Sequence, residues 1–363
     1  MVSEHCYLQH GGDVYRNPDS LDFSINLNPL GMPEMVKAAL KQGVDGWERY
    51  PDPVCEELRK AIGSYYEISS DFLICGNGAA ELIYLAVQAL KPKKAIVFSP
   101  SFSEYGQALK SFQCEIISFF LEKEEGFLPD MERLCRMIEE ESEGHIDMVF
   151  LCNPNNPTGI FVDKKQVKIL ADICKNAGTF LMIDECFCDF LEEPDKVSMM
   201  EYVREYSNIM ILKAFTKTYS MAGLRLGYGV SSDKILLEKI QKMRQPWSVS
   251  IPAQEAGIAA LKTDGDYLRK TRELLKSERI YLKEGLNQLG FQVFDSQANF
   301  LLFYDKRARE RNLWNLCLEK GLLIRNCDNF HGLGQGYYRI CLRNRKENER
   351  LLQVISEIEN IEK

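Results

Sequence analysis

The sequence predicts an α/β protein whose large domain is a doubly wound, mostly parallel sheet, accompanied by a smaller α+β domain. Four short runs are apolar almost throughout, as strands buried on both faces of a parallel sheet are. They lie at Lys94–Ser99, Asp147–Cys152, Thr179–Asp184 and Asn208–Leu212. Segments with apolar residues at helical spacing, Ala80–Leu90 and Lys165–Asn176, alternate with these runs. Such alternation predicts parallel strands joined by helical crossovers.

The pattern changes in the C-terminal third of the chain. Residues 265–290 predict one long, charged, amphipathic helix. Short strands at Gln297–Tyr304 and Tyr337–Leu342, with further helices, follow it. We place a domain boundary near Arg244–Trp247. Residues 41–246 then form the large domain, and residues 1–40 with 247–363 form the small domain and an N-terminal arm.

Composition excludes several classes of protein. The 363 residues are 45% hydrophobic and 27% charged, as in ordinary globular proteins, and the net charge of −8 gives no reason to expect nucleic acid or a membrane as partner. No stretch approaches the roughly 20 apolar residues of a membrane span, and the N-terminus lacks the pattern of a signal peptide. We therefore expect a cytoplasmic protein.

Cysteine and histidine usage predicts neither disulfides nor a metal site. Twelve cysteines are scattered along the chain without a Cys-x-x-Cys pair, and the four histidines lack metal-ligand spacing. Reduced, buried thiols are the expected state of these cysteines in a cytosolic protein.

The most informative segment is residues 216–228, which follow the apolar run that ends at Leu212. Lys217 comes just past the expected strand end, and a Gly-Leu-Arg-Leu-Gly turn containing Arg225 follows it. A lysine in this place can form a Schiff base with the aldehyde of pyridoxal phosphate (PLP), with Thr216 and Arg225 as donors to its phosphate. A lone lysine after a strand is more often a surface residue, so the interpretation depends on the combined spacing.

Three further motifs are candidates for cofactor contacts. The loop Cys75–Glu81 contains Gly-Asn-Gly and opens a helix, which suits an anion but is also a common turn. Cys152–Gly159 reads Cys-Asn-Pro-Asn-Asn-Pro-Thr-Gly, which is more specific than a turn requires. Asp184 ends a strand, where a carboxylate faces the ligand crevice of α/β folds or simply caps a helix.

Together these motifs resemble the fold-type I, PLP-dependent enzymes of the class I/II aminotransferase family. The resemblance implies that Asp184 holds the pyridine nitrogen of the cofactor and Asn156 donates to its phenolic oxygen. It also implies a phosphate cup made by the backbone amides of Gly78, Ala79 and Ala80.

The same resemblance predicts two aromatic contacts. Phe102 falls where the family stacks a ring on the cofactor, with Tyr105 as the reserve candidate and a plain core aromatic as the competing interpretation. Tyr50 matches a tyrosine that reaches the phosphate of the neighbouring subunit, which implies a homodimer. Two positions depart from the family pattern, because Phe187 replaces a tyrosine and Ala214 replaces a serine or threonine.

Several segments resemble one branch of the family, the threonine-phosphate decarboxylases of cobalamin biosynthesis. They are residues 10–13, 21–33, 184–190, 321–333 and 338–344. Histidinol-phosphate aminotransferases share the cofactor motifs but usually have Ser-Lys before the Gly-Leu-Arg turn and a tyrosine at position 187. This chain has Thr216, Lys217 and Phe187 there, which favours the decarboxylase branch.

The branch implies a small, doubly anionic substrate, L-threonine O-3-phosphate or a close analogue such as serine phosphate. Arg339 would hold the substrate carboxylate, because a guanidinium can bind it through two hydrogen bonds. Arg325, with His10, Asn26 or Asn28, would receive the phosphate. The expected reaction is decarboxylation through a Schiff base on Lys217. The alternatives are an aminotransferase of the histidinol-phosphate or aromatic type and a PLP-fold regulator without catalysis.

Overall fold

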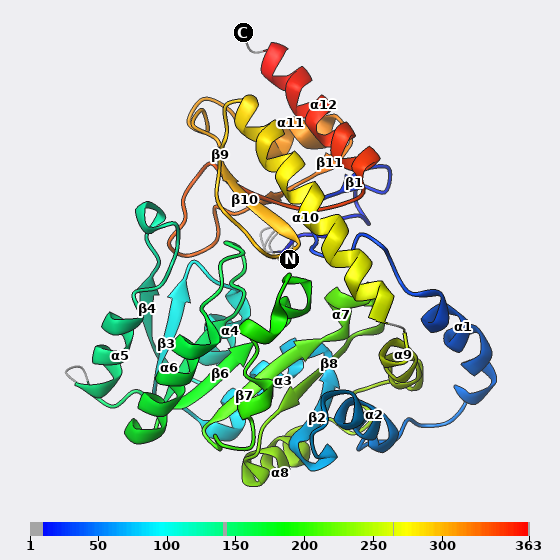
Figure 1. Cartoon of the computed structure of the whole chain (residues 1–363), viewed down its shortest axis with the longest axis vertical. Helices are drawn as coiled ribbons and strands as arrows, with labels where there is room; N and C mark the ends of the chain where they lie inside the picture. The colour runs from blue at the N-terminus through cyan, green and yellow to red at the C-terminus, as the bar shows by residue number, and fades with distance from the viewer. Residues whose placement is uncertain (1–9, 141–143, 264, 362–363) are drawn as a thin grey trace, which may run out of the picture.

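The computed structural model describes residues 10–140, 144–263 and 265–361 of the chain. A seven-stranded sheet forms the lower part of the molecule in Figure 1 and a four-stranded sheet forms the upper part. The strand order of the large sheet is β2-β8-β7-β6-β5-β3-β4. Its strands are β2 (Leu73–Asn77), β3 (Lys94–Ser99), β4 (Glu115–Phe120), β5 (Met148–Cys152), β6 (Phe180–Asp184), β7 (Ile209–Ala214) and β8 (Leu226–Val230).

The large sheet is parallel except for β8, which runs antiparallel to both of its neighbours. The four predicted strands are confirmed as β3, β5, β6 and β7. β7 continues two residues beyond the predicted end at Leu212, because Lys213 is buried in the strand and its Nζ lies 2.8 Å from Oδ1 of Asp189. A strand that is predicted from a run of apolar residues ends where such a lysine interrupts the run.

Helices cover both faces of the large sheet. Alternate residues of β5 point into two different cores, with Met148 and Phe150 in one and Val149 and Leu151 in the other. One core is covered by α3 (Gly78–Leu90), α4 (Ser103–Ser111) and α8 (Lys234–Met243). The other is covered by α1 (Glu34–Gly43), α2 (Glu56–Tyr66), α5 (Met131–Glu139), α6 (Lys164–Ala177) and α9 (Ile251–Leu261). The doubly wound arrangement is therefore as predicted.

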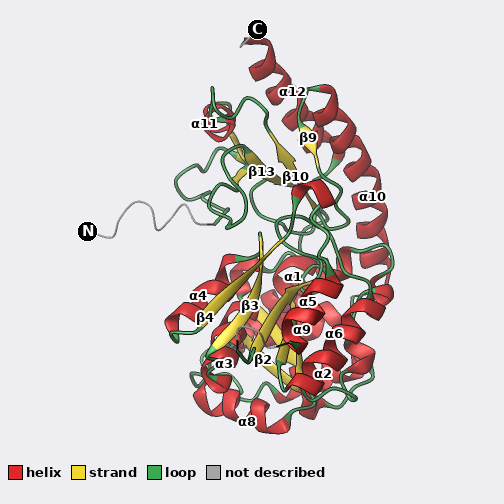
Figure 2. Ribbon diagram, turned by 90° about the vertical axis from the view of Figure 1, so that its left-hand side faces the viewer, coloured by secondary structure: helices red, strands yellow, loops and turns green. Residues whose placement is uncertain are grey.

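The small sheet is antiparallel throughout, with the order β12-β13-β10-β9. Its strands are β9 (Gln292–Val293), β10 (Phe300–Tyr304), β12 (Arg325–Asn326) and β13 (Tyr337–Cys341). α10 (Gly265–Gln288) packs against α12 (Arg345–Ile361), and Figure 2 shows α10 running along one side of both parts of the molecule. The predicted long helix is thus confirmed. The division at residues 246 and 247 stays a prediction.

Shorter elements complete the chain. β1 (Leu21–Asp22) pairs in parallel with β11 (Leu322–Leu323) in a separate two-stranded sheet, which ties the N-terminal segment to the chain just before β12. α11 (Leu313–Glu319) leads into β11, and α7 (Phe215–Thr218) follows β7 directly. The 3₁₀ helices are η2 (Val44–Gly46), η3 (Ser70–Phe72), η4 (Lys123–Glu125), η5 (Cys188–Phe190), η6 (Pro194–Lys196), η7 (Met200–Tyr202) and η8 (Ala222–Leu224).

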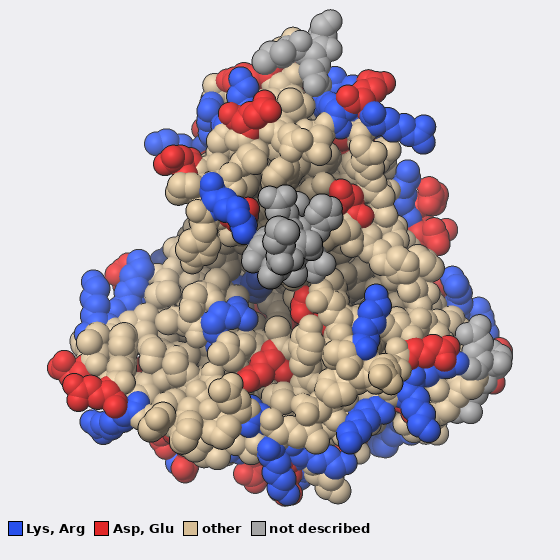
Figure 3. All heavy atoms as spheres, turned by 180° about the vertical axis from the view of Figure 1, so that it is seen from behind, with Lys and Arg blue, Asp and Glu red and all other residues tan. Residues whose placement is uncertain are grey.

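The surface carries mixed charge. Lysines and arginines lie among aspartates and glutamates on the face shown in Figure 3. Within the described ranges, no helix is both long enough and apolar enough to cross a membrane. Eleven cysteines fall in these ranges, and all are free and buried.

Candidate active site

A cavity of about 410 Å³ is lined by residues from both sheets and from the N-terminal loop. Its walls include the segments that follow β2, β5, β6 and β7, the start of α4, and residues of β12 and β13. Because the carboxyl ends of parallel strands meet at one edge of a sheet, these distant segments converge. The predicted site residues that line the cavity are His10, Asn26, Gly78, Ala79, Ala80, Phe102, Asn156, Asp184, Thr216, Lys217, Arg225, Arg325 and Arg339.

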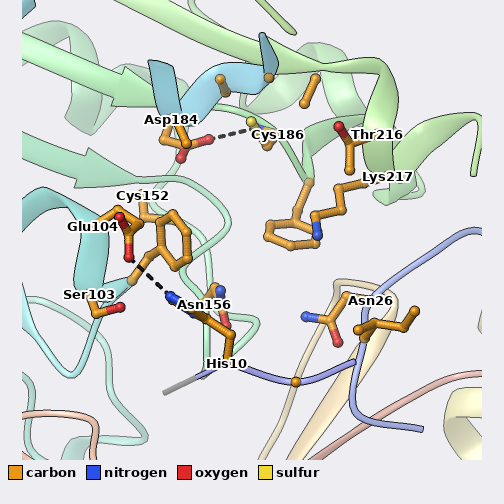
Figure 4. A pocket seen from close by; sticks show the side chains of 18 of the residues that line it. His10, Asn26, Ser103, Glu104, Cys152, Asn156, Asp184, Cys186, Thr216 and Lys217 are labelled. Atoms are coloured by element: carbon orange, nitrogen blue, oxygen red, sulfur yellow. Dashed lines mark hydrogen bonds and ion pairs between the residues drawn. The ribbon is translucent and has the colours of Figure 1, made fainter. Parts of the chain in front are cut away.

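Lys217 lies on α7, which begins directly after β7. Its Nζ lies 6.0 Å from the centre of the Phe187 ring, and Figure 4 shows the Lys217 side chain extending into the cavity. Burial, followed by the positive charge of Arg339, lowers the pKa of Lys217 from 10.5 to about 8. A lysine with this pKa supplies more neutral amine near neutral pH than a surface lysine does. Only the neutral amine can attack an aldehyde.

This pKa predicts how fast the cofactor-free protein links to PLP at different pH values. The rate should rise with pH up to about 8 and then level off, because the neutral amine of Lys217 predominates above its pKa. A surface lysine with a pKa near 10.5 would still gain about tenfold per pH unit in that range. Stopped-flow absorbance of apoprotein mixed with PLP measures the rate. A rate that keeps rising steeply far above pH 8 would contradict the prediction.

Asp184 ends β6 and is almost fully buried. Its Oδ2 accepts a hydrogen bond of 2.6 Å from the hydroxyl of Tyr105, and its Oδ1 accepts one of 2.9 Å from the backbone N–H of Cys186. The contact with Cys186 is of the kind that a capping carboxylate makes. The side chain nevertheless lines the cavity, where Figure 4 shows it opposite Lys217.

A helix N-terminus and a guanidinium meet in the cavity lining. α3 begins at Gly78, whose φ is +76°, and a Cβ at this position would come within 2.6 Å of Nη2 of Arg225. Gly227 is equally constrained, since its Cβ would lie 2.3 Å from the backbone nitrogen of Ala79. The free N–H groups of α3, the Arg225 guanidinium and the hydroxyl of Thr216 form a donor set that suits a phosphate.

Arg325 and Arg339 lie directly opposite each other on the antiparallel strands β12 and β13. Both are buried, and burial together with the neighbouring Arg325 lowers the pKa of Arg339 to about 10. Arg339 donates through Nη1 to Oδ1 of Asn156 and through Nη2 to the carbonyl of Ser24 at 2.9 Å, while its Nε has no hydrogen-bond partner among the described residues. Arg325 donates to Oδ1 of Asn329 at 2.8 Å. Because Oδ1 of Asn156 accepts from Arg339, its amide nitrogen is the end that can donate to a ligand.

The N-terminal loop supplies the outer wall. His10 Nε2 lies 3.1 Å from Oε1 of Glu104, a residue of α4, and Figure 4 shows this pair bridging the loop and the helix. Asn26 is buried in the lining, and its Oδ1 has no hydrogen-bond partner in the part of the chain that the structure describes. An unsatisfied polar atom of this kind is expected where a ligand supplies the partner.

Two predicted site residues lie outside the cavity lining. The amide nitrogen of Asn28 donates to the carbonyl of Thr218 and to the hydroxyl of Thr271, both at 2.9 Å, so Asn28 ties α7 to α10 instead of facing a substrate. We therefore leave Asn28 out of the substrate site. Tyr50 is 78% exposed and stacks on Trp247 with ring centres 4.4 Å apart. Its predicted role toward a neighbouring subunit stays a prediction.

The two aromatic candidates differ in their contacts. Both Phe102 and Tyr105 line the cavity, but the hydroxyl of Tyr105 is engaged by Asp184. Phe187 and Ala214 also line the cavity, where both present only carbon atoms. Hydroxyl donors that a related enzyme could use at these two positions are therefore missing in this chain.

A family model described as aminotransferase class I and II matches residues 18–355 of the chain. The chain belongs to this family. As a class I/II aminotransferase family member it depends on PLP, so the cofactor and fold predicted from the sequence are confirmed. In the described ranges no cluster of three or more histidine, cysteine, aspartate or glutamate side chains could hold a metal ion.

Individual members of the aminotransferase family give a finer comparison. The threonine-phosphate decarboxylase of Salmonella typhimurium is 36% identical over 358 residues, which cover 96% of each chain. The adenosylcobalamin biosynthesis bifunctional protein CobDQ of Leptospira interrogans is 30% identical over 96% of this chain, and the match covers 41% of that protein. Among solved structures, the histidinol-phosphate aminotransferase of Clostridium acetobutylicum has a TM-score of 0.86 and 31% identity, covering 94% of this chain and 99% of that one.

The residues of this cavity fit PLP. The close contact between Gly78 and Arg225 leaves backbone N–H groups and a guanidinium for the phosphate. Asp184 provides a carboxylate that would suit the pyridine nitrogen, and Asn156 provides an amide nitrogen that would suit the phenolic oxygen. Lys217 has the depressed pKa that carbonyl chemistry requires.

Sequence reasoning missed several residues of the lining, among them Ser24, Glu104 and Cys186. Glu104 lies in the same segment as Phe102, but only the fold brings it to His10. Ser24 is positioned by the N-terminal loop, where its hydroxyl accepts from the backbone N–H of Gly12 at 2.7 Å. Cys186 follows Asp184 by two residues, and this spacing is the signal that could have found it.

Proposed function

We propose that this chain catalyses the PLP-dependent decarboxylation of L-threonine O-3-phosphate or a close analogue. The observation that carries the proposal is the 36% identity, over 96% of both chains, to a protein named threonine-phosphate decarboxylase. The cavity supports it, because such a substrate presents a carboxylate and a phosphate to two adjacent buried arginines. The bifunctional relative is named for adenosylcobalamin biosynthesis, and we assign this reaction to the same biosynthesis.

Each polar residue then has a task in the reaction. Arg339 binds the substrate carboxylate, and Arg325 with His10 and Asn26 binds the phosphate. By fixing both ends of the substrate, these residues decide which bond at its Cα is broken. Thr216, Arg225 and the N-terminus of α3 hold the cofactor phosphate.

Proton and electron flow depend on the deep part of the cavity. Bound PLP supplies an aromatic ring that accepts the electron pair of the broken bond. Asp184 holds a proton on the pyridine nitrogen, and Asn156 donates to the phenolic oxygen. Lys217 carries the cofactor and, once released, holds or transfers a proton at Nζ, which its pKa of about 8 permits near neutral pH.

The test is direct. Holoenzyme is mixed with O-phospho-L-threonine in the absence of any keto acid, and CO2 release is followed together with the cofactor spectrum. Catalytic CO2 release with recovery of the original spectrum is the expected result. Conversion of the cofactor to its pyridoxamine form without CO2 would contradict the decarboxylase function.

That second outcome would identify an aminotransferase of the histidinol-phosphate or aromatic type. The observation that favours this alternative is the close match in fold, with 31% identity, to the histidinol-phosphate aminotransferase of Clostridium acetobutylicum. Histidinol phosphate with 2-oxoglutarate would then be the next substrate pair to assay. The absence of Tyr at position 187 and the Thr216–Lys217 pair support the decarboxylase instead.

Arg325→Gln should raise KM for O-phospho-L-threonine by about 10- to 100-fold, because a charge-assisted contact to the phosphate is lost. kcat should change much less, since Arg325 contacts no reacting bond in the proposed site. Steady-state kinetics with phosphorylated and unphosphorylated threonine measure the loss of preference. Arg309→Gln, at an exposed position, is the matched control. An unchanged KM in Arg325→Gln would remove this residue from the phosphate site.

We also propose that the enzyme is a cytoplasmic homodimer. The buried free thiols support a reducing compartment. Trp47, Tyr50 and Trp247 are partly exposed, with Val44 and Val54 nearby in the sequence and also exposed, and aromatic groups at a surface favour a protein interface. In a dimer, Tyr50 would reach the cofactor phosphate of the partner. Light scattering of the holoenzyme gives the oligomeric state, and a monomeric, fully active enzyme would overturn this part of the proposal.

A further inference from the structure

Tyr105 occupies a position between two walls of the cavity. It lies on α4, three residues after Phe102, and is 1% exposed. Its ring stacks on Phe150 of β5, with centres 4.9 Å apart and planes at 18°. The same ring meets Phe102 edge-on, with centres 5.6 Å apart and planes at 82°. These contacts leave the ring of Tyr105 with one well-defined orientation.

The hydroxyl of this ring is the partner of Asp184. It donates to Oδ2 at 2.6 Å, which is within the range of a charge-assisted O–H···O⁻ bond. Burial, and next the charge of Asp184, raise the pKa of Tyr105 well above 10, so the phenol keeps its proton and can only donate toward the carboxylate. The direction of the hydrogen bond is therefore fixed at every working pH.

Asp184 is held at both oxygens. Oδ1 accepts from the backbone N–H of Cys186 at 2.9 Å, and Oδ2 accepts from Tyr105. Two donors on two different oxygens prevent rotation of the carboxylate about its bond to Cβ. Each carboxylate oxygen retains a further acceptor position, so the carboxylate can bind a third donor without losing the first two.

We propose that Tyr105 is a positioning residue that aims Asp184 at the pyridine nitrogen of PLP and couples this contact to the stacking wall formed by Phe102. The proposal rests on the assignment of this cavity as the PLP site. Tyr105 then links two contacts with the cofactor ring, that of Asp184 with its pyridine nitrogen and that of Phe102 with its face. A displacement of α4 would disturb both contacts together.

The first test uses Tyr105→Phe, which removes the hydroxyl and keeps the ring that packs on Phe150. We expect PLP to bind the apoprotein about 10- to 100-fold more weakly, since one hydrogen bond to a buried charged group is lost. The visible circular dichroism of the bound cofactor should change, because the ring is no longer held in one orientation. The ¹⁵N chemical shift of labelled PLP should move as well, since the contact at the pyridine nitrogen is altered.

The matched control is Tyr206→Phe. Tyr206 is buried and donates to Oδ1 of Asp172 at 2.7 Å. The variant therefore removes a hydrogen bond of the same kind, between a tyrosine hydroxyl and an aspartate, that lies outside the cavity lining. This control should leave the PLP dissociation constant, the circular dichroism and the ¹⁵N shift unchanged. Thermal melts of both apoproteins measure any general loss of stability. A Tyr105→Phe protein that melts earlier but keeps wild-type cofactor signals would overturn the proposal.

Incorporation of 3-fluorotyrosine at position 105 provides a second variant in case Tyr105→Phe does not fold. It keeps the hydroxyl and the packing but makes the phenol a stronger donor. If both variants fold, the ¹⁵N shift should move in opposite directions in the fluorinated protein and in Tyr105→Phe. If only the fluorinated protein folds, its ¹⁵N shift should differ from that of wild type. An unchanged shift would refute the proposal. Because these signals need no substrate, they are independent of whether the enzyme is a decarboxylase or an aminotransferase.

Discussion

Replacing Lys217 with alanine should lower the turnover of O-phospho-L-threonine by at least about 10³-fold, because both the covalent attachment of the cofactor and its proton carrier are lost. The side chain extends into the cavity from a short helix whose flanking residues Phe215, Thr216 and Thr218 are buried. Shortening Lys217 therefore leaves the surrounding backbone in place. CO2 release under single-turnover and steady-state conditions measures the loss.

The Lys217→Ala protein should still fold and still bind PLP, but without a covalent link. Its absorbance should resemble that of free aldehyde, and borohydride should no longer attach the cofactor to the chain. Lys239→Ala, at an exposed position of α8, is the control and should retain full activity. Product formation by Lys217→Ala at the wild-type rate would refute the assigned role of this lysine.

Asp184→Asn should lower kcat by about 10²- to 10³-fold, the cost typical of removing one preorganised electrostatic contact from a reaction centre. The amide has nearly the same shape as the carboxylate but no charge with which to hold a proton on the pyridine nitrogen. The amide oxygen can still accept from the backbone N–H of Cys186, and the amide nitrogen can donate to the hydroxyl oxygen of Tyr105. One hydrogen bond is thereby reversed, but both partners remain satisfied. Steady-state kinetics at saturating PLP separate this effect from weaker cofactor binding.

Asp172→Asn is the matched control for this substitution, because Asp172 also accepts from a tyrosine hydroxyl but lies on α6, away from the cavity lining. It should leave kcat unchanged. An Asp184→Asn enzyme whose kcat equals that of wild type would show that the charge at this position does not assist the reaction.

The sequence was sufficient for the residues that follow strand ends. Asp184 and Lys217 each come directly after an apolar run, and parallel strands bring their carboxyl ends to one edge of the sheet. Local pattern therefore predicted that these residues converge, whereas their roles toward the cofactor stay a prediction. The same logic predicted a helix from Ala80 to Leu90 after a glycine-containing loop, and α3 begins slightly earlier, at Gly78.

The sequence was not sufficient where a side chain's partner lies far away in the chain. Asn26 and Asn28 share one short motif, yet only Asn28 is engaged by Thr271, a contact that spans 243 positions. Phe102 was the candidate for one aromatic position and Tyr105 the reserve, and the sequence did not show that Tyr105 packs on Phe150. Lys213 ended a predicted strand too early, since its partner Asp189 was not recognisable from local pattern.

The register that sets Arg325 opposite Arg339 has a consequence for the lifetime of the protein. Two like charges held side by side in a buried place oppose folding while the cavity is empty. An anion bound between the two guanidinium groups attracts both and offsets their repulsion. The ligand therefore stabilises the folded chain by mass action. Proteases and chaperones act on the opened state, whose population falls as the site fills. A cell that supplies substrate would therefore also preserve the enzyme that consumes it.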